Sequence, residues 1–184
     1  GDMAFLDQKR AFHNGGEDTV YGHALRAVRY IHEKAGAHGL PLIGKADWND
    51  AYDSVGTGGK GESIWLAEAL CRAFQTVEEL ATARGDGAIA KEMLDRYAGL
   101  SKIVNDIGWD GEWYLAAFND AGRKIGSREN KEGRVPLNSQ TWAILSKIVT
   151  PERLASILRQ IDGYLATPFG PALFLPPYTD FEPG

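Results

Sequence analysis

The sequence predicts an all-α fold, and three observations lead to this prediction. Apolar residues recur at the three- and four-residue spacing of an amphipathic helix in five separate segments. Long glycine-rich loops separate several of these segments, and 22 of the 184 residues are glycine. Strand-like residues are confined to one short hairpin. The five expected helices follow the segments 20–31, 67–81, 89–107, 139–149 and 151–161.

Capping residues mark the ends of the first three helices. Asp18 or Thr19 provides a side-chain oxygen for the first amide groups of the first helix, and Gly36 follows its end. The second helix ends before Gly85, and Asp86 stands near the start of the third. We therefore expect the second and third helices to be joined by a short turn.

The stretch after Gly108 predicts a hairpin. Residues 113–118 are aromatic or apolar, residues 119–122 are the turn-forming sequence Asn-Asp-Ala-Gly, and residues 123–125 supply the second strand. The aromatic residues within 109–114 have two interpretations. They either stack on a sugar or pack the hairpin against the helices, and the second interpretation is favoured.

The last helix has a strong start signal, since Thr150 is an N-cap residue and Pro151 occupies the first helical position. The tail from Thr167 onward holds five of the eight prolines, so we expect it to be extended. No internal repeat, low-complexity segment or domain boundary interrupts the chain. Residues 1–184 are therefore predicted to form one domain.

The composition excludes several classes of protein. The 20 basic and 25 acidic side chains give a net charge of −5, which argues against a nucleic-acid-binding surface or attachment to an anionic membrane. No run approaches the ~18 consecutive apolar residues of a membrane span. The single Cys71 excludes an intrachain disulfide framework, and the four histidines show no metal-ligand pattern. No signal peptide begins the chain, so we expect a cytoplasmic protein. We also expect it to use no metal and no cofactor.

The glycine-rich segment 56–61 matches the pattern G-x-G-x-x-G, but it does not predict a nucleotide site. The preceding residues 50–55 are not a buried strand, and Ser54 stands where a P-loop needs its first glycine. The remaining interpretation is local. Glycine amides and Lys60 lie together before a helix, which suits an anion, and the alternative is a flexible turn.

The segment 46–50 places two carboxylates, an amide and an indole in a loop. An indole face suits a sugar ring, and the carboxylates Asp47 and Asp50 suit either sugar hydroxyls or proton transfer. The alternative is structural, with Asp47 and Asn49 forming turns and Trp48 anchoring the core. The sequence leaves both interpretations open.

Several segments, taken together and in order, resemble the catalytic core of the cellobiose and chitobiose phosphorylases, which form glycoside hydrolase family 94. The resemblance spans roughly residues 15–182. The segments that carry it are 39–44, 46–50, 59–65, 109–114, 126–130, 138–142 and 176–179.

The resemblance implies part of an (α/α)₆ barrel and inverting phosphorolysis of a β-linked disaccharide or oligosaccharide, which gives a sugar 1-phosphate. It implies that Asp50 is the general acid and that Trp48 lines the sugar subsite beside Asp47. Lys60 stands where the family commonly has an arginine that contacts phosphate, so the contact becomes a point charge. Gln140 matches a glutamine expected to face the active site.

The chemistry of phosphorolysis is consistent with one catalytic carboxyl group. An inverting glycosidase uses one carboxyl group as acid and a second as base for water. Inorganic phosphate is already an anionic nucleophile, so it acts as the co-substrate and only the acid is needed. Asp50 and Lys60 supply the acid and a cation within ten residues.

Family members are several times longer than this chain, so we interpret residues 1–184 as a single partial domain. We expect little or no activity from it alone. Apolar helix faces left uncovered predict self-association, through Ile64, Leu70 and Phe74 on one helix and Leu154, Leu158 and Ile161 on another. Two alternatives are a non-catalytic carbohydrate-binding module and the related domain of a cyclic β-1,2-glucan synthase.

Overall fold

A computed structural model describes residues 3–179, and these residues are mainly helical. All five expected helices are present: α1 (Val20–Glu33), α2 (Ile64–Ala83), α3 (Gly87–Ile107), α4 (Leu137–Leu145) and α5 (Pro151–Gln160). The fourth ends earlier than residue 149, because Lys147 takes a left-handed backbone conformation with φ of 59° that a helix does not allow.

The predicted caps are confirmed. The side chain of Thr19 accepts a hydrogen bond from the Gly22 amide at 2.9 Å, and that of Thr150 accepts one from the Arg153 amide at 3.3 Å. Asp86 caps α3 in the same way. Each cap satisfies an amide that has no partner within its helix and is worth about 1 kcal/mol.

The prediction that strands are confined to one hairpin is wrong. The expected hairpin is present but short, and it belongs to a three-stranded antiparallel sheet in the order β3-β4-β5. Two further two-stranded sheets are formed by β1 with β2 and by β6 with β7. The strands are β1 (Lys9–Ala11), β2 (Glu17–Thr19), β3 (Glu62–Ser63), β4 (Ala117–Phe118), β5 (Lys124–Ile125), β6 (Ala166–Thr167) and β7 (Gly170–Pro171). Strands of two or three residues are too short to show the two-residue alternation by which a sequence reveals them.

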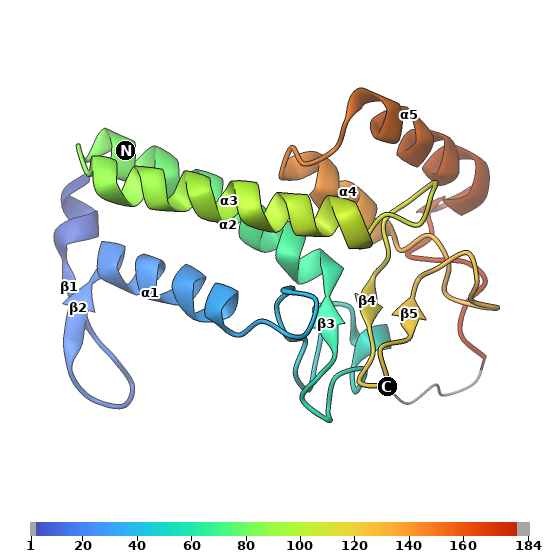
Figure 1. Cartoon of the computed structure of the whole chain (residues 1–184), viewed down its shortest axis with the longest axis horizontal. Helices are drawn as coiled ribbons and strands as arrows, with labels where there is room; N and C mark the ends of the chain where they lie inside the picture. Colours follow the sequence, from blue (N-terminus) through green and yellow to red (C-terminus); the bar gives the residue numbers. More distant parts are fainter. Residues whose placement is uncertain (1–2, 180–184) are drawn as a thin grey trace.

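The helices α2 and α3 lie side by side along most of their length, with α1 next to them and α4 against α2 (Figure 1). The sheet β3-β4-β5 and the long loops before α2 and after α3 gather at one end of this helix pair (Figure 1). The hairpin β1-β2 lies at the other end. The N-terminal end of α2 therefore faces this group of loops.

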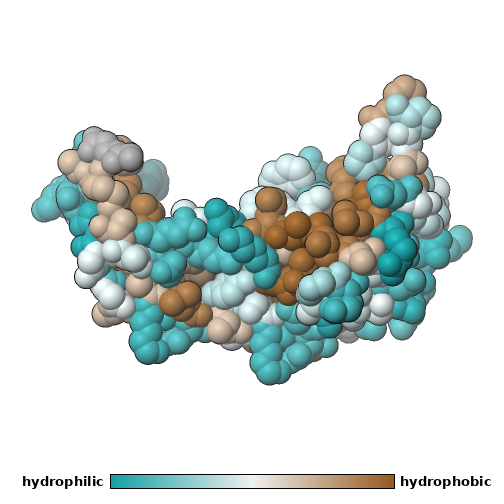
Figure 2. Space-filling model, turned by 90° about the horizontal axis from the view of Figure 1, so that it is seen from above, coloured by the Kyte–Doolittle hydropathy of each residue, from teal (hydrophilic) through white to brown (hydrophobic). Residues whose placement is uncertain are grey.

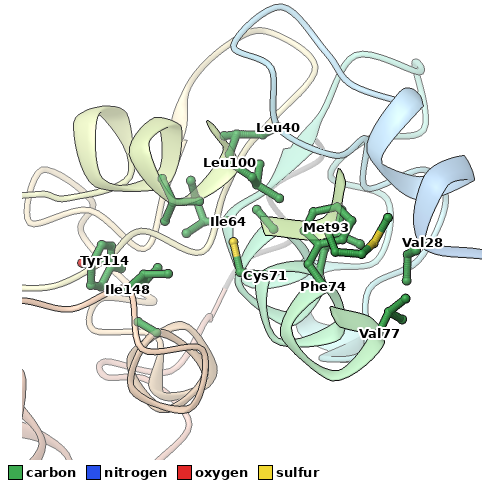
Figure 3. Close-up of a cluster of buried hydrophobic side chains, with 14 of the residues drawn as sticks. Val28, Leu40, Ile64, Cys71, Phe74, Val77, Met93, Leu100, Tyr114 and Ile148 are labelled. Carbon is green, nitrogen blue, oxygen red and sulfur yellow. The ribbon is translucent and has the colours of Figure 1, made fainter. Parts of the chain in front are cut away.

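The main core lies between α1, α2, α3 and α4 (Figure 3). Cys71 is buried within it, as its position on the apolar helix face predicts. Ile64 and Phe74 are fully buried and Leu70 is 3% exposed, so the expectation that these three residues form an uncovered face is wrong. Neighbouring helices of the same chain already cover them.

Apolar surface remains elsewhere. Leu145 at the end of α4 is 55% exposed, and Leu158 on α5 is 46% exposed. Figure 2 shows a continuous apolar area on the face seen from above the view of Figure 1. Leu154 and Ile161 are half-buried.

Candidate functional site

Hydrogen bonds near the start of α2 join the two ends of the loop that connects α1 to α2. The amide of Ile43 donates to the carbonyl of Gly61 at 2.9 Å, and Leu42 forms a β-bridge with Glu62. These bonds bring the two ends of residues 43–61 together, and we call this segment the site loop. All of Asp47, Trp48, Asp50 and Lys60 lie on it, so the structure gathers four of the five predicted site residues on one closed loop.

Asp47 is held inside the site loop by two hydrogen bonds. Its Oδ1 accepts from the Asn49 amide at 2.9 Å, and its Oδ2 accepts from Ser63 Oγ at 3.4 Å. Burial raises the pKa of Asp47, and the hydrogen bonds from Asn49 and Ser63 oppose that rise. Asn49 Oδ1 in turn accepts from the Ala51 amide at 3.1 Å, so the turn-forming alternative is correct for this part of the loop.

Asp50 begins a short 3₁₀-helix (Asp50–Tyr52), and its side chain is exposed. It lines a pocket of about 460 Å³. The opposite wall comes from the C-terminal segment, where the rings of Phe174 and Tyr178 lie 6.0 Å and 6.5 Å from the ring of Tyr52. Ligand pockets typically measure about 300–1,000 Å³, so this pocket has room for a sugar unit beside Asp50.

Trp48 is 69% exposed, which contradicts the alternative that it anchors the core. Its ring lies 6.1 Å from that of Trp65 on α2, and Trp65 makes an edge-to-face contact with Trp142 on α4, also at 6.1 Å. Three tryptophans from three different elements therefore form a row. An exposed indole offers the flat apolar surface that a sugar ring packs against.

Lys60 is exposed on the glycine-rich part of the site loop. Within residues 3–179, its ammonium group makes no ion pair or hydrogen bond. The nearby amides are occupied, because those of Gly58, Lys60 and Gly61 all donate to the carboxylate of Asp120. The expectation that this segment suits an anion is correct in its geometry, and the anion in the structure is a side chain of the same chain.

Gln140 is fully buried, unlike the other predicted site residues. Its Nε2 donates to the carbonyls of Tyr114 at 2.7 Å and Pro136 at 3.0 Å, and its Oε1 accepts from the Tyr114 amide at 2.9 Å. These bonds fasten α4 to the segment before β4. These bonds give Gln140 a structural role in the described residues. Its contact with substrate stays a prediction.

The packing interpretation of the aromatic residues before β4 is confirmed. Trp113 is 6% exposed, Tyr114 is fully buried, and Tyr114 belongs to the main core. Trp113 Nε1 donates to the carbonyl of Gly126 at 2.7 Å. Their rings are therefore not available to stack on a sugar.

Two buried glutamates were not identified as functional residues from the sequence. Glu62 is 2% exposed and accepts from the amides of His38 at 3.0 Å and Leu40 at 3.1 Å, and also pairs with the His38 ring at 2.5 Å. It thereby fixes the segment that leads into the site loop. Glu68 on α2 is fully buried, and neither of its oxygens has a hydrogen-bond partner among the described residues. Burial raises the pKa of Glu68 well above its usual value. A charged residue at an apolar position of the α2 pattern is the one sequence signal that could have found Glu68.

Within residues 3–179, no group of three or more histidine, cysteine, aspartate or glutamate side chains is arranged to hold a metal ion. Across the same described residues, no helix combines the length and the apolar character that a membrane crossing requires.

Comparison with known proteins adds relatives over the whole chain. The chain is 44% identical over 184 residues to a solabiose phosphorylase of Paenibacillus borealis, covering 99% of this chain and 24% of the relative. It is 41% identical over 184 residues to a 3-O-beta-D-glucopyranosyl-beta-D-glucuronide phosphorylase of the same organism, covering 100% of this chain and 24% of the relative. It is also 34% identical over 172 residues to a cyclic beta-(1,2)-glucan synthase of Rhizobium meliloti, covering 90% of this chain and 6% of the relative. The chain therefore spans about a quarter of the length of the phosphorylases that it matches.

Solved structures agree at the level of the fold. A GH78 family rhamnosidase of Bacillus sp. GL1 superposes with a TM-score of 0.59 at 21% identity, over 84% of this chain and 15% of that structure. A rhamnosidase of Klebsiella oxytoca gives the same TM-score at 19% identity, over 84% of this chain and 26% of that structure. A family model described as the glycosyl hydrolase 94 superfamily, catalytic domain, matches residues 1–183. With this family model matching nearly every residue, and with phosphorylase relatives along its whole length, the chain belongs to the glycosyl hydrolase 94 superfamily.

Proposed function

We propose that this chain is the acid-bearing part of an inverting glycoside phosphorylase, which cleaves a β-linked disaccharide or oligosaccharide with inorganic phosphate. The observation that supports this most is the closed site loop, which places Asp50 at a pocket and holds Trp48 and Lys60 on the same loop. The phosphorylase names of the relatives support the same reaction class. Because the chain covers about a quarter of these relatives, we propose that it forms part of a larger (α/α)₆ barrel.

The proposed reaction needs one proton donor and one nucleophile. The carboxyl group of Asp50 gives its proton to the glycosidic oxygen as the bond from that oxygen to the anomeric carbon breaks. A phosphate oxygen attacks the anomeric carbon from the opposite face, which inverts its configuration and gives a sugar 1-phosphate. Asp50 is left as a carboxylate and recovers a proton from solvent. Phosphate is already an anionic nucleophile, so the reaction needs no second carboxylate to take a proton from the attacking group. We propose that it uses no cofactor.

The other site-loop residues have supporting roles in this proposal. The exposed face of Trp48 packs against the sugar, and Asp47 binds a sugar hydroxyl while it braces the loop. Lys60 attracts phosphate through a single charged ammonium group.

The test is phosphate-dependent release of sugar 1-phosphate by the chain within its complete reading frame. Asp50→Asn removes the transferable proton and should lower the rate by about 10²–10⁴, the usual contribution of general acid catalysis. Asp106→Asn on the exposed surface of α3 is the matched control and should leave the rate unchanged. Near-normal turnover in Asp50→Asn, together with a large loss in Asp47→Asn, would assign the acid role to Asp47 instead.

A second candidate function follows from one specific similarity. The chain matches a cyclic beta-(1,2)-glucan synthase over 90% of its length, so the same site could act on glucan chains. Product analysis separates the two candidates. A phosphorylase releases sugar 1-phosphate from a short saccharide, whereas a glucan-trimming domain changes the chain length of a β-1,2-glucan. Saccharide binding without either product would identify a non-catalytic binding module.

A further inference from the structure

The carboxylate of Asp120 accepts hydrogen bonds from three backbone amides of the site loop. Its Oδ2 accepts from the Gly58 amide at 2.6 Å, and its Oδ1 accepts from the amides of Lys60 at 2.8 Å and Gly61 at 2.9 Å. Asp120 lies in the turn between β4 and β5, about sixty residues away in the sequence. Three converging amides form the concave arrangement that binds anions in proteins, and here it is filled from within the chain.

Asp120 also donates a hydrogen bond to the site loop, and the residues around both Asp120 and Gly58 favour this contact. The Asp120 amide donates to the carbonyl of Val55 at 3.2 Å, so one residue holds the site loop at both ends of its glycine-rich part. A Cβ atom on Gly58 would lie 2.9 Å from the Asp120 carboxylate. Asn119 shapes the turn that presents Asp120, because its Oδ1 accepts from the amides of Ala121 at 3.0 Å and Arg123 at 2.9 Å.

Because the amides of Gly58, Lys60 and Gly61 already donate to Asp120, they are not available to bind phosphate. The amides that the sequence suggests as an anion site already have the negative charge of Asp120 next to them. The hydrogen bonds from the Lys60 and Gly58 amides lower the pKa of Asp120, so this charge is present at neutral pH. In the glycine-rich part of the loop, residues 56–61, the Lys60 ammonium therefore remains as the cationic group for an incoming anion, and its charge also contributes to the lowered pKa of Asp120.

We infer that Asp120 is a positioning residue for phosphate: it holds the glycine-rich part of the site loop in one conformation, so that Lys60 meets phosphate through its side chain and not through the loop amides. This inference rests on the proposed function, because it assigns phosphate to that loop. It differs from a competing role, in which Asp120 has to leave before phosphate can bind the same amides. The two roles predict opposite effects when the carboxylate is removed.

The experiment uses the ¹⁵N-labelled 184-residue chain in solution. Hydrogen exchange is measured at the amides of residues 58, 60 and 61, and inorganic phosphate is then titrated, with sulfate as the control for general anion effects. The variants are Asp120→Asn, Asp120→Ala and Gly58→Ala. The matched controls are Asp106→Asn on the surface of α3 and Gly99→Ala, whose added Cβ would meet open space.

We expect exchange at the three amides to become at least about tenfold faster in all three variants, since each loses hydrogen bonds to a charged group. We expect phosphate to shift the Lys60 resonances of the wild type more than sulfate does. The dissociation constant for phosphate should rise about tenfold in Asp120→Asn and Asp120→Ala, while both controls match the wild type.

Three results would overturn the inference. They are unchanged amide exchange in the Asp120 variants, phosphate binding by Asp120→Ala as tight as or tighter than that of the wild type, and no phosphate response in the wild-type loop. Release of sugar 1-phosphate is measured separately in the complete reading frame. A wild-type protein that binds phosphate at the loop but releases no sugar 1-phosphate contradicts the proposed function and still supports the positioning role of Asp120.

Discussion

Ser63 Oγ donates to Asp47 Oδ2 at 3.4 Å while the same oxygen accepts from the Leu66 amide at 3.0 Å. One hydroxyl therefore caps α2 and braces the first carboxylate of the site loop. This links the conformation of the loop to the start of α2, where Ile64 directly follows the cap and is fully buried. Loss of that hydroxyl affects the loop and the helix together.

Ser63→Ala should lower the free energy of unfolding by about 1–2 kcal/mol, because the Leu66 amide loses its cap and Asp47 loses a donor. Urea unfolding followed by circular dichroism measures this. Thr150→Ala, which removes only the cap of α5, is the matched control for a lost cap. A Ser63→Ala loss no larger than the Thr150→Ala loss would show that the bond to Asp47 adds no stability.

Lys60→Ala should raise the Michaelis constant for phosphate by about tenfold and leave that for the saccharide nearly unchanged, because one charge-assisted contact is lost. Lys60→Arg should retain phosphate use, since a guanidinium group also binds phosphate and is common at this position in the family. Initial rates with each substrate varied in turn measure both constants. Equal losses for phosphate and saccharide in Lys60→Ala would give the lysine a structural role.

Glu68→Gln should remove a pH dependence of stability. The pKa of Glu68 is raised in the folded chain, so above its unfolded value the unfolded state releases a proton that the folded state keeps. Stability of the wild type therefore falls as pH rises from about 4.5 toward the folded pKa. Urea unfolding between about pH 5 and pH 8 should show a steeper decline in the wild type than in Glu68→Gln. Glu79→Gln, on the exposed side of α2, should keep the wild-type slope, and an equal slope in all three proteins would contradict a protonated Glu68.

We propose that the isolated chain self-associates through its remaining apolar surface, of which Leu158 is one exposed part. Sedimentation equilibrium should show dimers or larger species at micromolar concentration, and Leu158→Asp should shift the population toward monomer. Thr76→Asp, a charge placed on the exposed side of α2, is the control and should leave the distribution unchanged. A monomeric wild type at every concentration would refute this proposal.

The sequence by itself determined the presence and order of the five helices, although α4 ends at Leu145 and not at residue 149. The periodic apolar residues of α2 and α3, and the caps at Thr19, Asp86 and Thr150, act through neighbours three or four residues away. Such contacts depend only on the local order of residues, so the five helices could be predicted. The resemblance in the ordered segments likewise indicated the family, and the position of Asp50 in one of them suggested its role.

Only the tertiary structure decided which polar groups meet. The Asp120 carboxylate and the Gly58 amide are 62 residues apart, and Glu62 meets the amide of His38 across 24 residues. Neither contact has a periodic signal, because it depends on how whole loops pack at the end of α2. Gln140 shows that a local motif does not predict burial either. Its segment resembles a site motif, yet the structure places its side-chain amide inside the protein. Hydrogen bonds within one helix are set by sequence spacing, whereas those between loops are set by the packing that brings the loops together.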